Sequence, residues 1–253
     1  MAHLRCDFRS EALDMNTSMT VVLPEGVSLS SVPVIYLFHG LCDNCSGWSR
    51  YTSVERYARK YNAALMIPEV QRSFYTDMAF GLSYYTFIHD ELPQLCRRFF
   101  SLPSERAYNY VMGLSMGGYA ALKCALHTPE RYAGCATFSA VTDIRQRVIS
   151  SEGRARLEFE AIFGNPAGIP ESCDLFAMAG KADAALLPRF YTAVGEQDEL
   201  YGQNERFVSL MQEKGADIRY EHWAGIHNWD FWDTAVCRAL DYMLGTPSGG
   251  VMK

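Results

Sequence analysis

Short apolar runs alternate with longer amphipathic runs along most of the chain. Residues 34–38 form a continuous apolar run, as expected for a strand that is buried on both faces of a sheet. Further strand candidates share this short apolar character and lie at residues 20–23, 64–67, 107–112, 133–138, 190–194 and 218–222. The last of these is the most polar, which favours a position at the edge. The alternation predicts an α/β protein with a mostly parallel central sheet and helices on both faces.

Two apolar stripes with helical spacing lie between and after these strands. One consists of Tyr85, Ile88, Leu92, Leu95 and Phe99, and it is interrupted by a proline at position 93 that should kink or restart the helix. The other is formed near the end of the chain by Trp232, Val236, Ala239 and Met243. Both stripes indicate core packing.

The stretch from 141 to 187 breaks this rhythm, because it carries many charges and then a segment rich in glycine and proline. It is interpreted as an insertion near the active site, and not as a strand of the sheet. Residues 1–245 are expected to form one domain, and residues 246–253, rich in glycine, to form a flexible tail.

The composition excludes several classes of protein. Apolar residues make up 49% of the 253 positions and the formal net charge is −6, with no long basic run, so nucleic acid is not an expected partner. No apolar stretch reaches the roughly 20 residues that a membrane-spanning helix needs. The charged N-terminal segment does not resemble a signal peptide, which predicts a cytoplasmic protein. Eight scattered cysteines, with Cys42 and Cys45 as the one close pair, predict free and mostly buried thiols and no metal site.

The most informative segment is Gly113-Leu-Ser115-Met-Gly117, which follows a predicted strand and opens an alanine-rich predicted helix. This spacing is the nucleophile-elbow pattern. The serine lies at the apex of a strained turn, so that its hydroxyl projects from the carboxyl edge of the sheet. Small residues on either side allow the strand and the helix to approach each other. Ser115 is therefore the candidate nucleophile.

A serine hydroxyl needs a base, and the base needs an acceptor that orients it. Of six histidines, His227 lies in the loop between the last predicted strand and the last predicted helix, where elbow hydrolases carry their base. The loop after residues 190–194 offers Asp198, with Glu196 and Glu199 as alternatives. The chain order Ser115, Asp198, His227 agrees with that of elbow hydrolases.

The oxyanion that forms on the substrate needs two backbone donors. The amide of Met116 follows the nucleophile, and the amide of Leu41 lies in the loop after the central strand, so these two are the candidates. His39 in the same loop is expected to shape the loop. The substrate-binding candidates among nearby aromatic residues are Trp229, Tyr75 and Trp48, with Phe74 and Tyr84 also near enough to contribute.

The sequence resembles the putative-esterase family of α/β-hydrolases, in particular the tributyrin esterases. S-formylglutathione hydrolases and mycolyltransferases are more distant relatives in appearance. The similarity covers most of the chain and runs through segments 15–24, 37–40, 72–77, 113–119, 195–201 and 225–232. It implies the α/β-hydrolase fold, a triad at the same three residues, and no cofactor. It also implies serine carboxylesterase activity on small-molecule esters with acyl groups from acetyl to butyryl, including acetylated sugars.

Other activities on the same scaffold stay open at this point. They are a feruloyl or cinnamoyl esterase, a thioesterase acting on S-formylglutathione, an acyltransferase that uses an alcohol in place of water, and a catalytically silent binding protein. The complete set of three triad residues argues against the last. The sequence also leaves open whether the protein forms a homo-oligomer.

Overall fold

The computed structural model describes residues 1–165 and 168–245 of the chain. A single eight-stranded sheet forms its centre, with the strand order β1-β2-β4-β3-β5-β6-β7-β8. The strands β3 to β8 pair in parallel, while β1 and β2 form an antiparallel hairpin at one edge and β2 pairs antiparallel with β4. Their bounds are β1 Ala2–Ser10, β2 Met15–Leu23, β3 Val34–Phe38, β4 Ala64–Pro68, β5 Asn109–Leu114, β6 Gly134–Phe138, β7 Arg189–Gly195 and β8 Ile218–Trp223.

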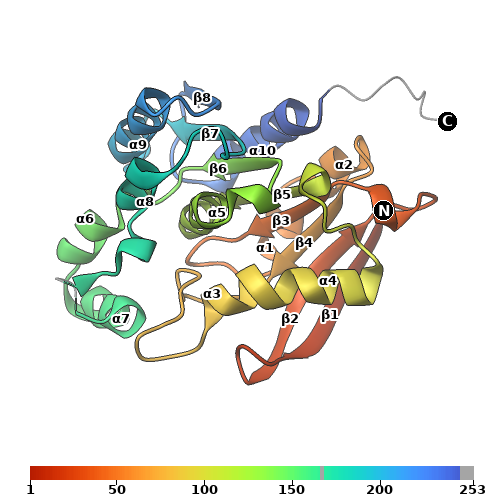
Figure 1. Cartoon of the computed structure of the whole chain (residues 1–253), viewed down its shortest axis with the longest axis horizontal. Helices are drawn as coiled ribbons and strands as arrows, with labels where there is room; N and C mark the ends of the chain where they lie inside the picture. The colour runs from red at the N-terminus through yellow and green to blue at the C-terminus, as the bar shows by residue number, and fades with distance from the viewer. Residues whose placement is uncertain (166–167, 246–253) are drawn as a thin grey trace.

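Helices cover both faces of this sheet, as expected. Their bounds are α1 Gly47–Tyr51, α2 Val54–Arg59, α3 Tyr84–Thr86, α4 Leu92–Phe100, α5 Met116–His127, α6 Ile144–Ile149, α7 Gly153–Phe163, α8 Leu175–Lys181, α9 Tyr201–Glu213 and α10 Trp229–Leu244. Single 3₁₀ turns span η1 Leu29–Ser31, η3 Arg106–Tyr108, η4 Pro129–Arg131 and η6 Glu171–Cys173. Figure 1 shows α4 lying across β1 and β2, and α5 beside the central strands.

Each face of the sheet has its own hydrophobic core. Along β3, Val34 and Phe38 face a core shared with α4, α5, α8 and α9. The alternate residues Ile35 and Leu37 face a second core shared with α1, α2 and α10. All five positions of β3 are buried, which explains the continuous apolar run in the sequence. Burial of each such side chain contributes about 1.5–3 kcal/mol.

All strands predicted from the sequence are present. The structure adds β1, which the sequence analysis did not predict. β1 alternates Cys6 and Phe8, which pack against the core, with Arg5, Asp7 and Arg9, which point to solvent. This period of two is the signature of an edge strand that is half buried. β8 lies at the other edge of the sheet, as its polarity indicated.

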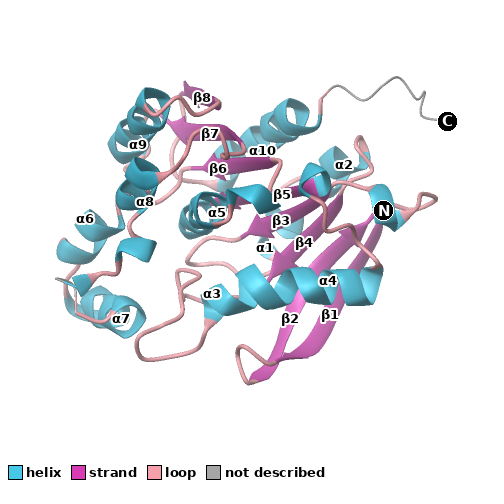
Figure 2. Ribbon diagram, in the orientation of Figure 1, coloured by secondary structure: helices cyan, strands magenta, loops and turns pink. Residues whose placement is uncertain are grey.

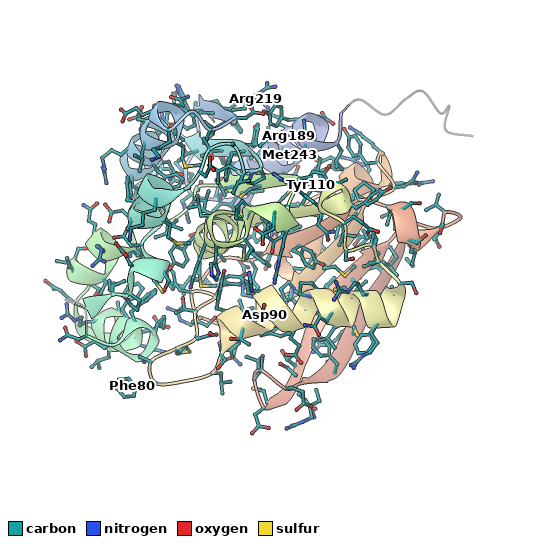
Figure 3. All side chains as sticks on the ribbon, viewed as in Figure 1. Phe80, Asp90, Tyr110, Arg189, Arg219 and Met243 are labelled. Atoms are coloured by element: carbon teal, nitrogen blue, oxygen red, sulfur yellow. The ribbon has the colours of Figure 1, made fainter. Side chains whose placement is uncertain are left out.

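The proline-interrupted stripe folds into consecutive helical segments. α3 continues into a π-helical turn, η2 (Phe87–Glu91), and α4 then begins at Leu92 with Pro93 in its first turn. Pro93 cannot donate to the His89 carbonyl oxygen in the preceding turn, and Arg131 Nη1 donates to that oxygen at 2.8 Å instead. At the other end of the chain, Arg189 donates to the Met243 carbonyl oxygen at 2.9 Å and so joins the start of β7 to the end of α10 (Figure 3).

Residues 141–187 contain α6, α7, η6 and α8, which follow β6 and precede β7 along the chain. Figure 2 shows α6, α7 and α8 on the same side of the molecule. Their described part contributes no strand to the sheet. The tail predicted at 246–253 lies outside the described residues. In the part of the chain that the structure describes, no helix combines the length and the apolar character needed to cross a bilayer.

Candidate active site

Ser115 lies between β5 and α5 in a conformation that few residues other than glycine adopt. Its φ of 51° and ψ of −114° make the chain turn sharply from strand to helix. A Cβ atom on Gly113 would overlap the Gly117 carbonyl group, and one on Gly117 would overlap the Phe38 carbonyl group. The glycines therefore allow the close approach of strand and helix that exposes the serine hydroxyl.

Three loops at the carboxyl edge of the sheet bring the predicted triad together. Ser115 Oγ donates a hydrogen bond to His227 Nε2 at 3.1 Å. His227 Nδ1 in turn donates to Asp198 Oδ2 at 2.9 Å. Asp198 follows β7, and His227 follows β8 and precedes α10. The three residues thus form one continuous chain of hydrogen bonds.

The surroundings of Asp198 favour its ionised form. Burial alone would raise the pKa of the carboxyl group, but hydrogen bonds from His227, Ser139 and the Leu200 amide outweigh burial and lower the pKa below its ordinary value. The His227 ring also meets the edge of the Trp232 ring, with centroids 4.9 Å apart. The imidazole is therefore fixed by a carboxylate on one side and an indole on the other.

The two alternative acids have other partners. Glu196 binds His222 at 3.0 Å, and Glu199 reaches Arg147 at 3.5 Å. Neither forms a hydrogen bond with His227 among the described residues. Of the three acids considered, Asp198 is the one that forms a hydrogen bond with His227 among the described residues.

The loop after β3 lies directly against the nucleophile. A Cβ atom on Gly40 would be 3.8 Å from Ser115 Cβ. Across the described residues, the hydrogen bonds of turns and loops include none donated by the Leu41 or the Met116 amide. Leu41 and Met116 therefore stay the candidates for the two oxyanion donors.

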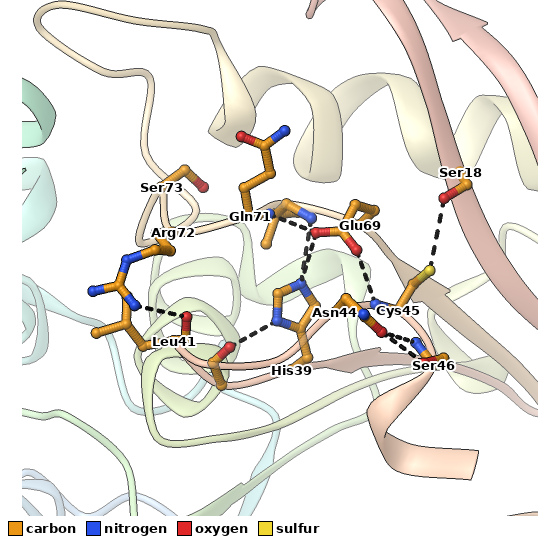
Figure 4. A network of polar contacts seen from close by, with 12 residues as sticks. Ser18, His39, Leu41, Asn44, Cys45, Ser46, Glu69, Gln71, Arg72 and Ser73 are labelled. Atoms are coloured by element: carbon orange, nitrogen blue, oxygen red, sulfur yellow. Dashed lines mark hydrogen bonds and ion pairs between the residues drawn. The ribbon is translucent and has the colours of Figure 1, made fainter. Parts of the chain in front are cut away.

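His39 holds this loop in place (Figure 4). Its Nδ1 donates to the Gly40 carbonyl oxygen at 2.8 Å, and its Nε2 accepts from the Val70 amide at 3.3 Å. Burial lowers the pKa of His39, which keeps the ring neutral and able to make both contacts. Arg72 Nη1 also donates to the Leu41 carbonyl oxygen at 3.4 Å. This contact holds the peptide group that follows Leu41.

A cavity of about 640 Å³ opens above Ser115 and His227. Trp229 and Phe74 line it, and so do Val141 and Arg147 from the stretch between β6 and β7. The cavity lining also includes residues that the sequence analysis did not propose for substrate binding, among them Tyr51, Cys42, Asp43, Asn228 and Arg147. Asn228 sits beside His227 and Cys42 beside Leu41, so proximity to the motif residues could have pointed to both.

Two of the substrate-binding candidates require correction. Trp48 is fully buried and packs edge-on against Trp229, with its Nε1 donating to the Phe38 carbonyl oxygen at 3.0 Å. Tyr75 is fully buried as well, and its hydroxyl donates to the His39 carbonyl oxygen at 3.0 Å. Both side chains support residues of the cavity from behind and do not line it. Burial is decided by tertiary packing, which their place near the motifs did not reveal.

The described residues hold no cluster of three or more histidine, cysteine or acidic side chains that could bind a metal ion. The site consists of a hydroxyl, an imidazole, a carboxylate and free backbone amides. This set is suited to nucleophilic attack on a carbonyl group and to stabilisation of the resulting oxyanion.

Known structures share this architecture over almost the whole chain. The fluorophosphonate-binding serine hydrolase F of Staphylococcus aureus superposes with a TM-score of 0.89 at 30% identity, covering 96% of this chain and 98% of that one. An S-formylglutathione hydrolase from the same organism superposes with a TM-score of 0.87, also at 30% identity, covering 96% and 99%. The fold is the α/β-hydrolase fold, and the class is that of the serine hydrolases.

The family follows from the sequence profile. The profile described as putative esterase matches residues 10–243, and the chain belongs to this family. It is an ester-hydrolysing enzyme. A curated relative, the acetyl esterase of Caldicellulosiruptor saccharolyticus, is 26% identical over 261 residues, which cover 96% of this chain and 98% of that protein.

Proposed function

We propose that the protein is a serine carboxylesterase that hydrolyses short-chain acyl esters, from acetyl to butyryl, through an acyl-enzyme on Ser115. The observation that carries the proposal is the continuous hydrogen-bond chain from Ser115 through His227 to Asp198. The polar residues Tyr51, Arg147 and Asn228 are among those that line the cavity, and they suit the hydroxyl groups of an alcohol such as a sugar. The similarity to an acetyl esterase supports the same acyl group.

The reaction proceeds in two halves. His227 Nε2 accepts the proton of the Ser115 hydroxyl as Oγ attacks the ester carbonyl, and the Leu41 and Met116 amides bind the oxyanion. His227 then returns the proton to the departing alcohol, which leaves the acyl group on Ser115. Water, deprotonated by the same imidazole, releases the acid. Each oxyanion donor is worth about 100–1,000-fold in turnover.

A second candidate is a thioesterase that acts on S-formylglutathione, and the 30% identity to such a hydrolase favours it. Solved structures named ferulic acid esterases share the fold at 19% identity or less, and an acyltransferase would use the same nucleophile. These activities differ in the leaving group or the acceptor. They share the attack by Ser115.

A substrate panel tests the proposal. Purified protein is assayed on p-nitrophenyl esters from acetate to laurate, on acetylated sugars, on methyl ferulate and on S-formylglutathione, with a competing alcohol to detect transfer. We expect the highest kcat/KM for acetate to butyrate, and a loss of about 10⁴–10⁶-fold in Ser115→Ala. Turnover of S-formylglutathione well above that of every oxygen ester would assign the thioesterase instead.

A cytoplasmic location, a single domain over 1–245 and a role for Trp229 in substrate binding stay predictions. For the last, the position of Trp229 in the cavity wall provides support. The proposed partner is a small-molecule ester.

A further inference from the structure

A buried ammonium group without a carboxylate partner lies on α5, outside the active site. The Lys123 residue is 4% exposed, and among the described residues its Nζ forms no ion pair. Its contacts are the Sγ atom of Cys173 at 3.6 Å and the face of the Tyr85 ring, whose centroid lies 4.1 Å away. A buried charge is costly unless it is paired, so this position calls for an explanation beyond packing.

The backbone fixes the relative positions of this lysine and this cysteine. Lys123 lies two helical turns beyond Ser115 on α5, and Cys173 ends η6 in the stretch between β6 and β7. The Tyr119 hydroxyl, one turn before Lys123, donates to the Cys173 carbonyl oxygen at 2.8 Å. The Nζ and Sγ atoms are thus held close by a contact that does not involve either side chain.

A cavity adjoins both residues. Lys123 and Cys173 both line a cavity of about 340 Å³ that is separate from the cavity above Ser115, with Ile162, Phe163 and Asp77 among its other lining residues. Phe163 packs against Phe74, which lines the cavity of the active site, with ring centroids 6.2 Å apart. The walls of the two cavities are therefore in contact through these two rings.

The surroundings of Cys173 are unusual in one respect, because an ammonium group donates to its sulfur atom. Burial raises the pKa of Cys96, Cys124 and Cys135, which keeps these thiols protonated and unreactive toward peroxide. Among the buried cysteines of the described chain, Cys173 receives a hydrogen bond from an ammonium group. Peroxide attacks a cysteine through its thiolate form, and the Lys123 ammonium donates directly to the sulfur atom that would carry that charge.

We propose that Lys123 and Cys173 form a redox modification site, at which hydrogen peroxide links Nζ to Sγ through a single oxygen atom. The thiolate first attacks peroxide and becomes a sulfenic acid, and the released hydroxide takes a proton from the ammonium to give water and a neutral amine. A second peroxide transfers oxygen to Nζ, which gives a hydroxylamine and water. The hydroxylamine oxygen then attacks Sγ and expels the sulfenic hydroxyl as a third water.

Overall, one amine, one thiol and two molecules of hydrogen peroxide give one N–O–S link and three molecules of water. Two equivalents of a dithiol reduce the N–O–S link, which restores the amine and the thiol and releases one molecule of water. The link would join α5, which follows the nucleophile, to the stretch between β6 and β7, which contributes lining residues to both cavities.

Peptide mapping tests the proposal. Native protein is treated with hydrogen peroxide, the remaining thiols are blocked, and trypsin digestion follows. Because a modified lysine resists trypsin, we expect peptide 107–131 joined to peptide 157–181, with the summed mass plus one oxygen and minus two hydrogens. Dithiothreitol should separate the pair. The linked protein should melt about 5 °C or more above the reduced protein, because the link restricts the unfolded chain.

Two variants separate this link from other oxidation products. Lys123→Arg keeps the positive charge but cannot form the link, and Cys173→Ser removes the sulfur, so the linked pair and the rise in Tm should vanish in both. Circular dichroism establishes that each variant is folded. A linked pair that persists in Lys123→Arg would indicate a disulfide between Cys124 and Cys173 and overturn the proposal. Oxidation of Cys173 to sulfinic acid without a linked pair would overturn it as well.

Discussion

Asp198 shows how one residue acquires its role from its surroundings. Its side chain is fully buried, yet three hydrogen bonds hold its pKa below the ordinary value. The negative charge therefore persists at neutral pH and favours the imidazolium that forms on His227 during attack. Glu196 and Glu199, on the same loop, are exposed and bind other partners.

Replacing Asp198 by asparagine should therefore impair catalysis with little effect on substrate binding. We expect kcat to fall about 10³–10⁴-fold with KM nearly unchanged, since the amide favours the wrong tautomer of His227. Steady-state kinetics on p-nitrophenyl acetate measures both constants. Glu196→Gln serves as the matched control and should leave them unchanged. Equal losses in the two variants would reject Asp198 as the orienting acid.

The sequence could predict the three residues that the structure joins by hydrogen bonds, because motif spacing and chain order restrict each choice. It could not decide which aromatic side chains face the cavity. Trp48 and Tyr75 lie as near to the motifs as Phe74 and Trp229 do, but packing buries the first two and exposes part of Trp229 to the cavity.

At the scale of elements, the strand–turn–helix unit from β5 to α5 sets the position of the nucleophile. Its helix runs close enough to β3 that Gly117 lies against the carbonyl groups of Phe38 and His39. This approach also places the oxyanion loop after β3 beside Ser115.

Gly117→Ala should disturb this unit because the added methyl group would overlap backbone atoms that cannot move aside. We expect the free energy of unfolding to fall by about 1–3 kcal/mol, together with a loss of esterase activity as Ser115 shifts. Urea denaturation and steady-state kinetics measure the two effects. Gly180→Ala in α8 is the control, since a Cβ atom there meets nothing within 4 Å. It should be neutral or stabilising by up to about 1 kcal/mol. A stable, active Gly117→Ala variant would contradict the packing argument.

The strands of the parallel region could be predicted because each is a short apolar run between turn signals. β1 was not predicted because apolar and charged residues alternate along it. Near the end of a chain, such a segment resembles a polar terminus more than a strand. The two strands at the antiparallel edge contribute no residue to the cavity above Ser115, so the error did not affect the site.

At the scale of the whole molecule, the sheet order brings distant segments to one edge. The loops after β3, β5, β7 and β8 carry Leu41, Ser115, Asp198 and His227, to which we assign an oxyanion donor, the nucleophile, the acid and the base. The sequence predicted this convergence from the elbow order. It could not predict that α6 would place Arg147 at the cavity, because the helices between β6 and β7 carry no motif and are positioned by tertiary contacts alone.

The most direct measurement is to trap the acyl-enzyme. Protein mixed rapidly with p-nitrophenyl butyrate and quenched in acid should release a burst of up to one p-nitrophenol per active site. Mass spectrometry should then find the butyryl group at Ser115 in tryptic peptide 107–123, and nothing at that peptide in Ser115→Ala. An acyl group on a different residue, or undiminished turnover in Ser115→Ala, would contradict the assignment of Ser115 as the nucleophile.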